Sequence, residues 1–174
     1  RREAIALTSS LQDVYTAFFD RVEKDRDFFR YFEVEEEMAM KLAEERAKTF
    51  LKEACSYIRR HIPLGFELKI VQGEDAQDRF AEEITDDEVE LLADVMMLPY
   101  YERGLVDLLP KINTFLASEL KLLHSPANER QTYVALIEQQ RARIDYLLAD
   151  YFSKDRLTGE EKYISTTLPE ESDE

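Results

Sequence analysis

The sequence contains no tryptophan, a single cysteine and two histidines. Cys55 alone cannot form an internal disulfide, and one cysteine with two histidines cannot complete a structural zinc site. Four glycines and five prolines are scattered over 174 residues, which favours long helices and leaves no glycine-rich loop for binding phosphates. The chain therefore predicts a domain that is stabilised by packing alone, with no metal and no cofactor.

Long apolar runs are also missing from the sequence. No segment approaches the roughly 18 to 20 apolar residues that a membrane span requires, and no short apolar segment follows a basic start as in a secretory signal peptide. These absences predict an intracellular protein that makes no contact with a membrane. At this length a domain buries about 70% of its unfolded surface, so a substantial core is expected.

Positive charge is scarce relative to negative charge. The 23 Lys and Arg residues stand against 38 Asp and Glu residues, which gives a net charge of −15. Because nucleic-acid binding depends on cations that neutralise phosphates, this balance argues against a conventional DNA or RNA binder. An acidic surface has three remaining interpretations: it keeps the protein soluble, it mimics DNA toward a basic protein, or it lines a passage through which DNA slides.

Apolar residues recur every three or four positions along most of the chain, which is the pattern of amphipathic helices. Pro99 and Pro110 are expected to break or kink the pattern between successive helices. The fold class that follows is mainly all-α, a bundle of four to five helices. The predicted helices cover residues 9–22, 35–61, 85–109 with a break or kink at Pro99, 112–123 and 125–152.

The helix predicted from residue 85 has the clearest start signal. Thr85 is followed three residues later by Glu88, the spacing of a capping box, and Ile84 is placed to pack against Val89. The residues that follow are apolar on more than one side of the helix. We therefore expect this helix to lie at the centre of the bundle.

One segment has the alternation of a strand. Phe66, Leu68 and Ile70 alternate with Glu67 and Lys69. A single strand must pair either within the chain, where no clear partner is visible, or with a neighbouring copy by edge addition. Residues 66–83 are accordingly predicted to form a short projecting strand and loop.

The last part of the chain differs in composition from the bundle. A bundle domain is expected over residues 1–152 and an extended, flexible, acidic tail over 153–174, since the tail is polar and ends in five residues of which four are acidic. The apolar residues that a partner would contact in this tail are Leu157, Tyr163, Ile164 and Leu168.

Catalytic motifs are not evident. His61 and His124 are far apart in sequence and each falls at a predicted helix end, where histidine commonly interacts with terminal carbonyls. Cys55 lies among apolar helix positions and is interpreted as a packing residue. Adjacent carboxylates are abundant in so acidic a chain and carry no catalytic signal. The sequence thus favours a protein that is not an enzyme.

Two segments share a pattern with a known family. The first, FAEEITDDEVELLADVM, runs from Phe80 to Met96, and the second, SPANERQTYVALIEQQRARIDYLLADYF, runs from Ser125 to Phe152. These segments resemble neck or head-to-tail adaptor (connector) proteins of tailed bacteriophages. The shared pattern is an acidic loop before a capped helix, a linker, and a Ser-x-Ala-Asn start to a long final helix. The residues that match this pattern are Thr85, Asp86, Glu88, Leu92, Ala93, Ser125, Ala127 and Asn128.

The resemblance implies a virion structural protein, assembled in the bacterial host cytoplasm. Copies would form an oligomeric ring below the portal protein, join it to the next neck or tail protein, and enclose a channel through which DNA passes without specific binding. The rival hypothesis is an acidic DNA mimic that inhibits a basic host protein. The residues expected at the interface with other copies or the portal are Phe66, Leu68, Ile70, Leu157, Tyr163, Ile164 and Leu168.

Overall fold

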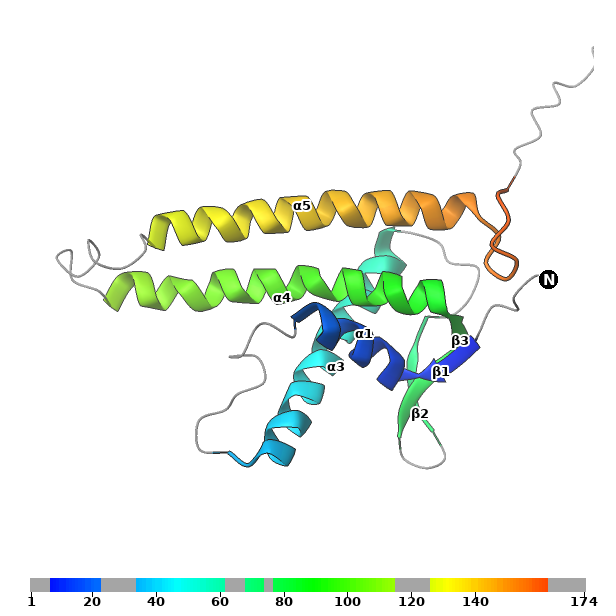
Figure 1. Ribbon diagram of the computed structural model, residues 1–174, viewed down its shortest axis with the longest axis horizontal. Helices are drawn as coiled ribbons and strands as arrows, with labels where there is room; N and C mark the ends of the chain where they lie inside the picture. Colours follow the sequence, from blue (N-terminus) through cyan, green and yellow to red (C-terminus); the bar gives the residue numbers. More distant parts are fainter. Residues whose placement is uncertain (1–6, 23–33, 62–67, 74–76, 115–125, 163–174) are drawn as a thin grey trace, which may run out of the picture.

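The computed structural model describes residues 7–22, 34–61, 68–73, 77–114 and 126–162 (Figure 1). Within these residues the chain is mainly helical with one small sheet, which confirms the expected class. The four helices are α1 (Leu11–Val22), α3 (Glu36–His61), α4 (Asp86–Thr114) and α5 (Pro126–Ser153). The three strands are β1 (Leu7–Ser10), β2 (Ile70–Gln72) and β3 (Asp78–Thr85).

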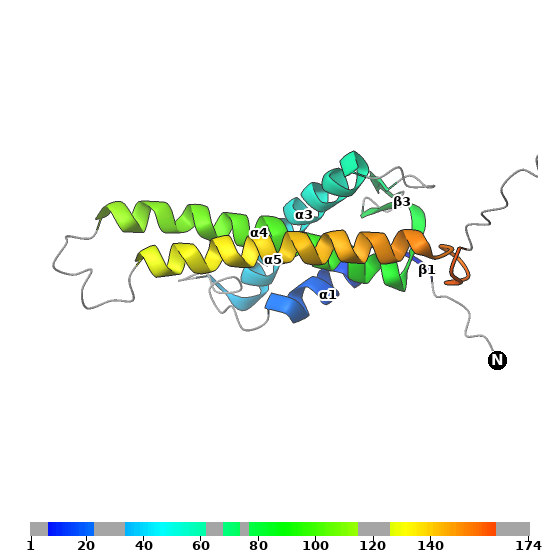
Figure 2. The same cartoon turned by 90° about the horizontal axis from the view of Figure 1, so that it is seen from above.

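Helix α4 lies at the centre of the molecule. It packs along α5 on one side and against α1 and α3 on the other, and the sheet lies at its N-terminal end (Figures 1 and 2). Every residue from 91 to 99 is buried, which agrees with the expectation of a central helix. The antiparallel α4 and α5 continue well beyond α1 and α3 at the end opposite the sheet, and we call this projecting part the overhang.

Capping residues set the starts of two helices. The Thr85 N–H donates to Glu88 Oε2 at 2.7 Å, and the Glu88 N–H donates to Thr85 Oγ1 at 3.3 Å, so the predicted capping box is present. Helix α1 begins at Leu11, two residues after the start of the predicted range 9–22, because Ser10 caps it. The Ser10 hydroxyl accepts from the Gln12 N–H at 3.1 Å.

The sheet differs from the expectation of a projecting strand and loop over residues 66–83. Strand β3 pairs antiparallel with β1 on one side and with β2 on the other, in the order β1-β3-β2. Phe80 and Ile84 of β3 are buried in the core, and this burial stabilises a strand in a segment whose mostly polar composition indicates a loop. The strand beginning at Ile70 therefore has its partner within the chain.

Pro99 lies inside a helix, so the break that the sequence offered as one of two outcomes, a break or a kink, does not occur. Helix α4 runs unbroken from Asp86 to Thr114, so the two segments predicted on either side of Pro99 are one helix. A proline inside a helix removes one hydrogen bond and costs about 3 kcal/mol. Contacts of α4 with α1, α3 and α5 offset this cost. The helix predicted over residues 112–123 is the end of α4 as far as Thr114, and its remainder lies outside the described residues.

Gly104 marks a close approach between α4 and α5. A Cβ atom at this position would lie 2.6 Å from Cε1 of Tyr133. We expect Gly104→Ala to lower the free energy of unfolding by about 1 kcal/mol, because overpacking outweighs the gain in helix propensity. In a Tyr133→Ala background the same change should instead stabilise the protein by about 0.5–1 kcal/mol. Urea unfolding of the four variants measures both effects, and an equal effect in both backgrounds would contradict the contact.

Candidate functional site

The residues predicted to form an interface fall in different settings. Leu68 is 3% exposed and belongs to the core, and half-buried Ile70 packs against that core. Leu157 is 57% exposed. The structure thus assigns Leu68 a packing role and leaves Leu157 as the largely exposed member among those described. Outside the described residues lie Phe66, Tyr163, Ile164 and Leu168.

The first part of the predicted tail forms an ordered turn. Residues 153–162 reverse direction, with the Asp155 N–H donating to the Glu160 carbonyl at 2.7 Å and the Lys162 N–H donating to the Ser153 carbonyl at 2.6 Å. Gly159 adopts a φ of 65°, a left-handed conformation that glycine adopts without steric cost. We call residues 153–162 the C-terminal turn; residues 163–174 lie outside the described residues.

Asp155 organises this turn from within. Its Oδ1 atom accepts from the Thr158 N–H at 2.9 Å and from the Leu157 N–H at 3.0 Å. These backbone hydrogen bonds, first that from Thr158, hold the pKa of Asp155 below its ordinary value. An aspartate that binds backbone N–H groups two and three residues ahead, followed by glycine, is a turn signal that was readable in the sequence.

Glu88 connects the C-terminal turn to the start of α4. Its carboxylate is 4% exposed and accepts from the Arg156 Nε at 2.6 Å, from a second Arg156 nitrogen at 3.1 Å, and from the Tyr151 hydroxyl. These bonds add to the cap on the Thr85 N–H. One buried carboxylate therefore joins the end of β3, the start of α4, the end of α5 and the turn.

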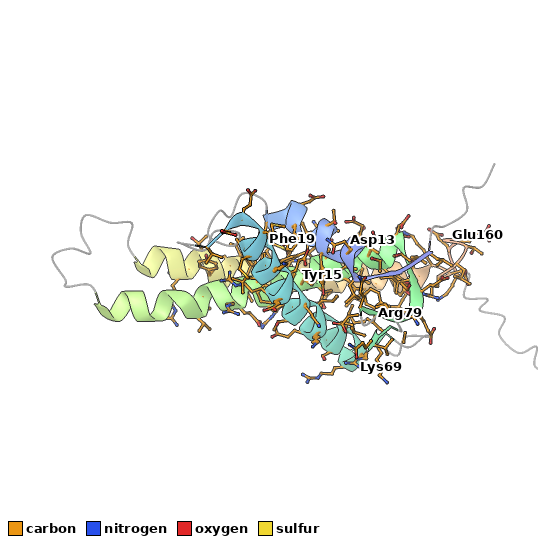
Figure 3. The ribbon with its side chains drawn as sticks, turned by 90° about the horizontal axis from the view of Figure 1, so that it is seen from below. Asp13, Tyr15, Phe19, Lys69, Arg79 and Glu160 are labelled. Atoms are coloured by element: carbon orange, nitrogen blue, oxygen red, sulfur yellow. The ribbon has the colours of Figure 1, made fainter. Side chains whose placement is uncertain are left out.

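Arg156 also reaches the sheet, because it donates to the backbone carbonyl of Glu83 in β3. Burial raises the pKa of Tyr151, and the hydrogen bond to Glu88 raises it further, so Tyr151 acts as a neutral donor. Figure 3 shows Glu160 of the turn at the end of the molecule, beyond Lys69 and Arg79 of the sheet region. The turn is thus fixed at the end of the molecule opposite the overhang.

The two outer strands of the sheet have an open side. In the part of the chain that the structure describes, β1 and β2 each pair with β3 and with no further strand. Leu7 of β1 is 46% exposed, whereas Ile70 of β2 is packed partly against the core. An edge strand with an exposed apolar residue is a template for pairing with another strand.

A second ionic centre holds three helices together. Asp94 of α4 is 7% exposed; its carboxylate accepts from Arg143 of α5 at 3.0 and 3.2 Å and from Arg21 of α1 at 3.4 Å. The Asp94 carbonyl accepts from Gln140 at 2.7 Å. Every donor comes from a neighbouring helix, so the role of this centre is to fix the bundle.

A groove of about 450 Å³ lies between α3 and α4. Its polar lining mixes both charges, with Lys52 and Arg60 on α3 and Glu102 on α4, and Glu102 is already paired with Arg141 at 2.9 Å. Across the described ranges there is no group of His, Cys, Asp and Glu side chains that could hold a metal ion.

No protein-family model, curated protein or solved structure matches this chain. Among the described helices, none is long and apolar enough to cross a membrane.

Proposed function

We propose that the protein is a subunit of a phage head-to-tail adaptor, a ring below the portal that lines the DNA channel and joins the capsid to the tail. The observation that carries this proposal is the arrangement of the described residues 80–114 and 126–152, within the two segments of the resemblance and the helix that follows the first. Strand β3 leads into α4, and α4 pairs with α5 in a unit that projects beyond the rest of the molecule (Figure 1). A projecting pair of helices suits a subunit that must reach its neighbours.

Exposed apolar side chains on the two long helices support contacts with other proteins. Val106, in the last third of α4, is 60% exposed, and Val134, in the first third of α5, is 39% exposed. Both positions belong to the halves of the helices that lead to the overhang. In the proposed ring they contact the adjacent subunit or the portal.

The charge of the chain suits a channel for DNA. The net charge is −15, and exposed acidic residues occupy the first turns of two helices, Glu36 and Glu37 on α3 and Asp86 and Asp87 on α4. Negative charge facing a lumen repels phosphates and lets DNA slide. The proposed role is structural and not enzymatic, and the protein would reside in the virion after assembly in the bacterial cytoplasm.

Negative-stain imaging with mass determination tests the proposal. The purified protein is examined alone and after mixing with the portal protein encoded beside it. We expect rings, either free or formed on the portal. A monomer or dimer that ignores the portal would contradict the adaptor, and binding to a basic nuclease would then support the DNA-mimic hypothesis.

A matched pair of variants tests the contact through α4. Val106→Glu places a charge on an exposed apolar site near the overhang, whereas Tyr146→Glu does so at a 72% exposed position on the other half of α5. Both variants should fold, because neither side chain is buried. We expect Val106→Glu to reduce ring formation more strongly than Tyr146→Glu.

A further inference from the structure

Helix α5 uses one side to pack along α4. On that side Ile137, Ile144 and Leu148 are 8%, 0% and 5% exposed. Figure 1 shows α5 along one edge of the molecule, and Figure 2, seen from above, shows it in front of α4. The side of α5 opposite Ile144 therefore faces outward.

This outward side carries a heptad repeat. Six exposed positions follow one another at alternating steps of four and three residues, namely Ala135, Gln139, Ala142, Tyr146, Ala149 and Ser153. We call these six residues the outer seam. Such steps are the a and d spacing of a coiled coil, and they keep one stripe of a helix turned toward a partner helix.

The outer seam has no charged residue, although all of it is exposed. In a chain that is 35% charged, a solvated helix face is expected to carry charges. The charges of this part of α5 lie beside the seam instead, Glu138 and Asp145 on one side and Arg143 and Asp150 on the other. Tyr146 in the seam is 72% exposed. An uncharged seam between charged flanks is the pattern of a helix that pairs with another helix.

The sizes of the seam residues match those of the same seam in an antiparallel copy. The register that uses all six positions pairs Ala142 with Tyr146, Gln139 with Ala149, and Ala135 with Ser153. Each pair sets an alanine against a larger residue, so the two helices can keep a nearly constant separation. In a parallel pair, Tyr146 would meet Tyr146 between layers of alanine, and the two rings would hold those alanines apart.

We propose that the outer seam pairs with the outer seam of a second copy, antiparallel and about a twofold axis near residue 144. The same residues of both copies form this contact, so it closes at two copies and does not extend into a ring. It is therefore distinct from the ring contact at Val106 and does not depend on the adaptor function.

The area of the contact predicts a dimer that exchanges with monomer. The outer seam spans about 28 Å of helix, and a strip about 10 Å wide along it covers about 300 Å² of each copy. Standard interfaces bury about 800 Å² on each partner, and smaller ones are weak or transient. We accordingly expect a dissociation constant in the micromolar range, so that a subunit can leave the dimer for another assembly.

Cross-linking between two single-cysteine variants tests the register. Full-length Gln139→Cys and Ala149→Cys chains are mixed, with no other protein, and treated with a short bismaleimide. Burial raises the pKa of the Cys55 thiol to about 12, so the native cysteine stays unreactive and the unmodified protein serves as control. We expect a cross-linked dimer in the mixture. Either variant alone should give far less, because like positions lie ten residues, about 15 Å, apart along the pair.

Two results of the cross-linking would overturn the inference. Links that are as abundant in each variant alone as in the mixture would show a parallel pair. Absence of a link from all three samples would show that the outer seam does not bind a second copy, and would leave it to a helix of another protein.

Sedimentation equilibrium of two charge variants provides a second readout. Tyr146→Glu places a charge in the outer seam, whereas Met38→Glu adds the same charge at a 52% exposed position on α3. Both variants should fold, because both side chains are exposed. We expect Tyr146→Glu to raise the dissociation constant of the dimer at least about tenfold and Met38→Glu to change it less than about twofold. Equal changes would contradict pairing through the seam.

The portal protein separates this inference from the adaptor function. Dimers that are lost in Tyr146→Glu but form no rings on the portal would support the outer seam and contradict the adaptor. Rings on the portal from a protein that never dimerises would overturn the inference and leave the adaptor standing.

Discussion

Replacing Glu88 with glutamine is expected to lower the free energy of unfolding by about 3 kcal/mol. The buried carboxylate receives hydrogen bonds from Thr85, Tyr151 and Arg156. The glutamine amide has one acceptor oxygen where the carboxylate has two. Its NH2 group would therefore face at least one of these donors, and that buried donor would have no acceptor. The expected loss lies at the lower end of the range for breaking a buried ion pair. Arg156 is 26% exposed, so water can hydrogen-bond to its guanidinium once the pair is broken.

Glu90→Gln is the matched control for Glu88→Gln, because it removes the same charge one half-turn along α4. Glu90 pairs with Arg21 at 2.6 Å, but its side chain is 62% exposed, so the expected loss is below about 1 kcal/mol. Urea unfolding measures both variants. A loss for Glu88→Gln no larger than that for Glu90→Gln would show that the buried centre does not hold the fold.

Glu88→Gln should also release the C-terminal turn. Lys154 and Arg156 are trypsin sites, and in the native protein Arg156 is held by Glu88 and by the Glu83 carbonyl. We expect trypsin to cut within residues 153–162 faster in Glu88→Gln than in Glu90→Gln. This readout separates release of the turn from a general loss of stability.

Phe18→Ala is expected to lower the free energy of unfolding by about 3–5 kcal/mol. Phe18 of α1 is fully buried, and its ring meets Phe50 of α3 edge-on at 5.9 Å and Tyr100 of α4 at 6.2 Å. Removing the ring leaves a cavity where three helices meet and ends both aromatic contacts. Because small domains are stable by only about 5–15 kcal/mol, this loss is a large part of the stability at the lower end of that range.

Two further variants keep the Phe18 prediction testable if Phe18→Ala does not fold. Phe18→Leu retains most of the volume and should cost about 1 kcal/mol. Phe19→Ala truncates the neighbouring, half-buried ring and should cost far less than Phe18→Ala, because a partly exposed side chain leaves no closed cavity. Equal losses for Phe18→Ala and Phe19→Ala would contradict the proposed aromatic centre.

Local signals predicted the helices well. The capping box of Thr85 and Glu88 placed the start of α4 within one residue of its observed position, and the ranges 35–61 and 125–152 predicted from periodicity agree with α3 and α5 within about one residue. These signals are readable because capping and periodicity involve residues only three or four positions apart. The same reasoning placed the apolar residues of α4 at the centre of the core.

The candidate site was predicted only in part. Leu157 was expected to be available to a partner and is exposed, whereas Leu68 was expected there and is buried. Arg156 and Asp155 were not singled out, because the tail was judged by its polar composition. The Asp-x-x-Thr-Gly turn could have been recognised locally, but the partner of Arg156 could not.

The sequence by itself determined the helical class, the starts of the three long helices, and the excess of negative charge. The tertiary structure decided the pairing of β1 with β3, the passage of α4 through Pro99, and the attachment of Arg156 to Glu88, 68 residues away. The physical reason is the range of the interactions. Helix caps and periodicity are local, whereas strand pairing, tolerance of a proline and a buried ion pair depend on surfaces that meet only when distant segments pack together.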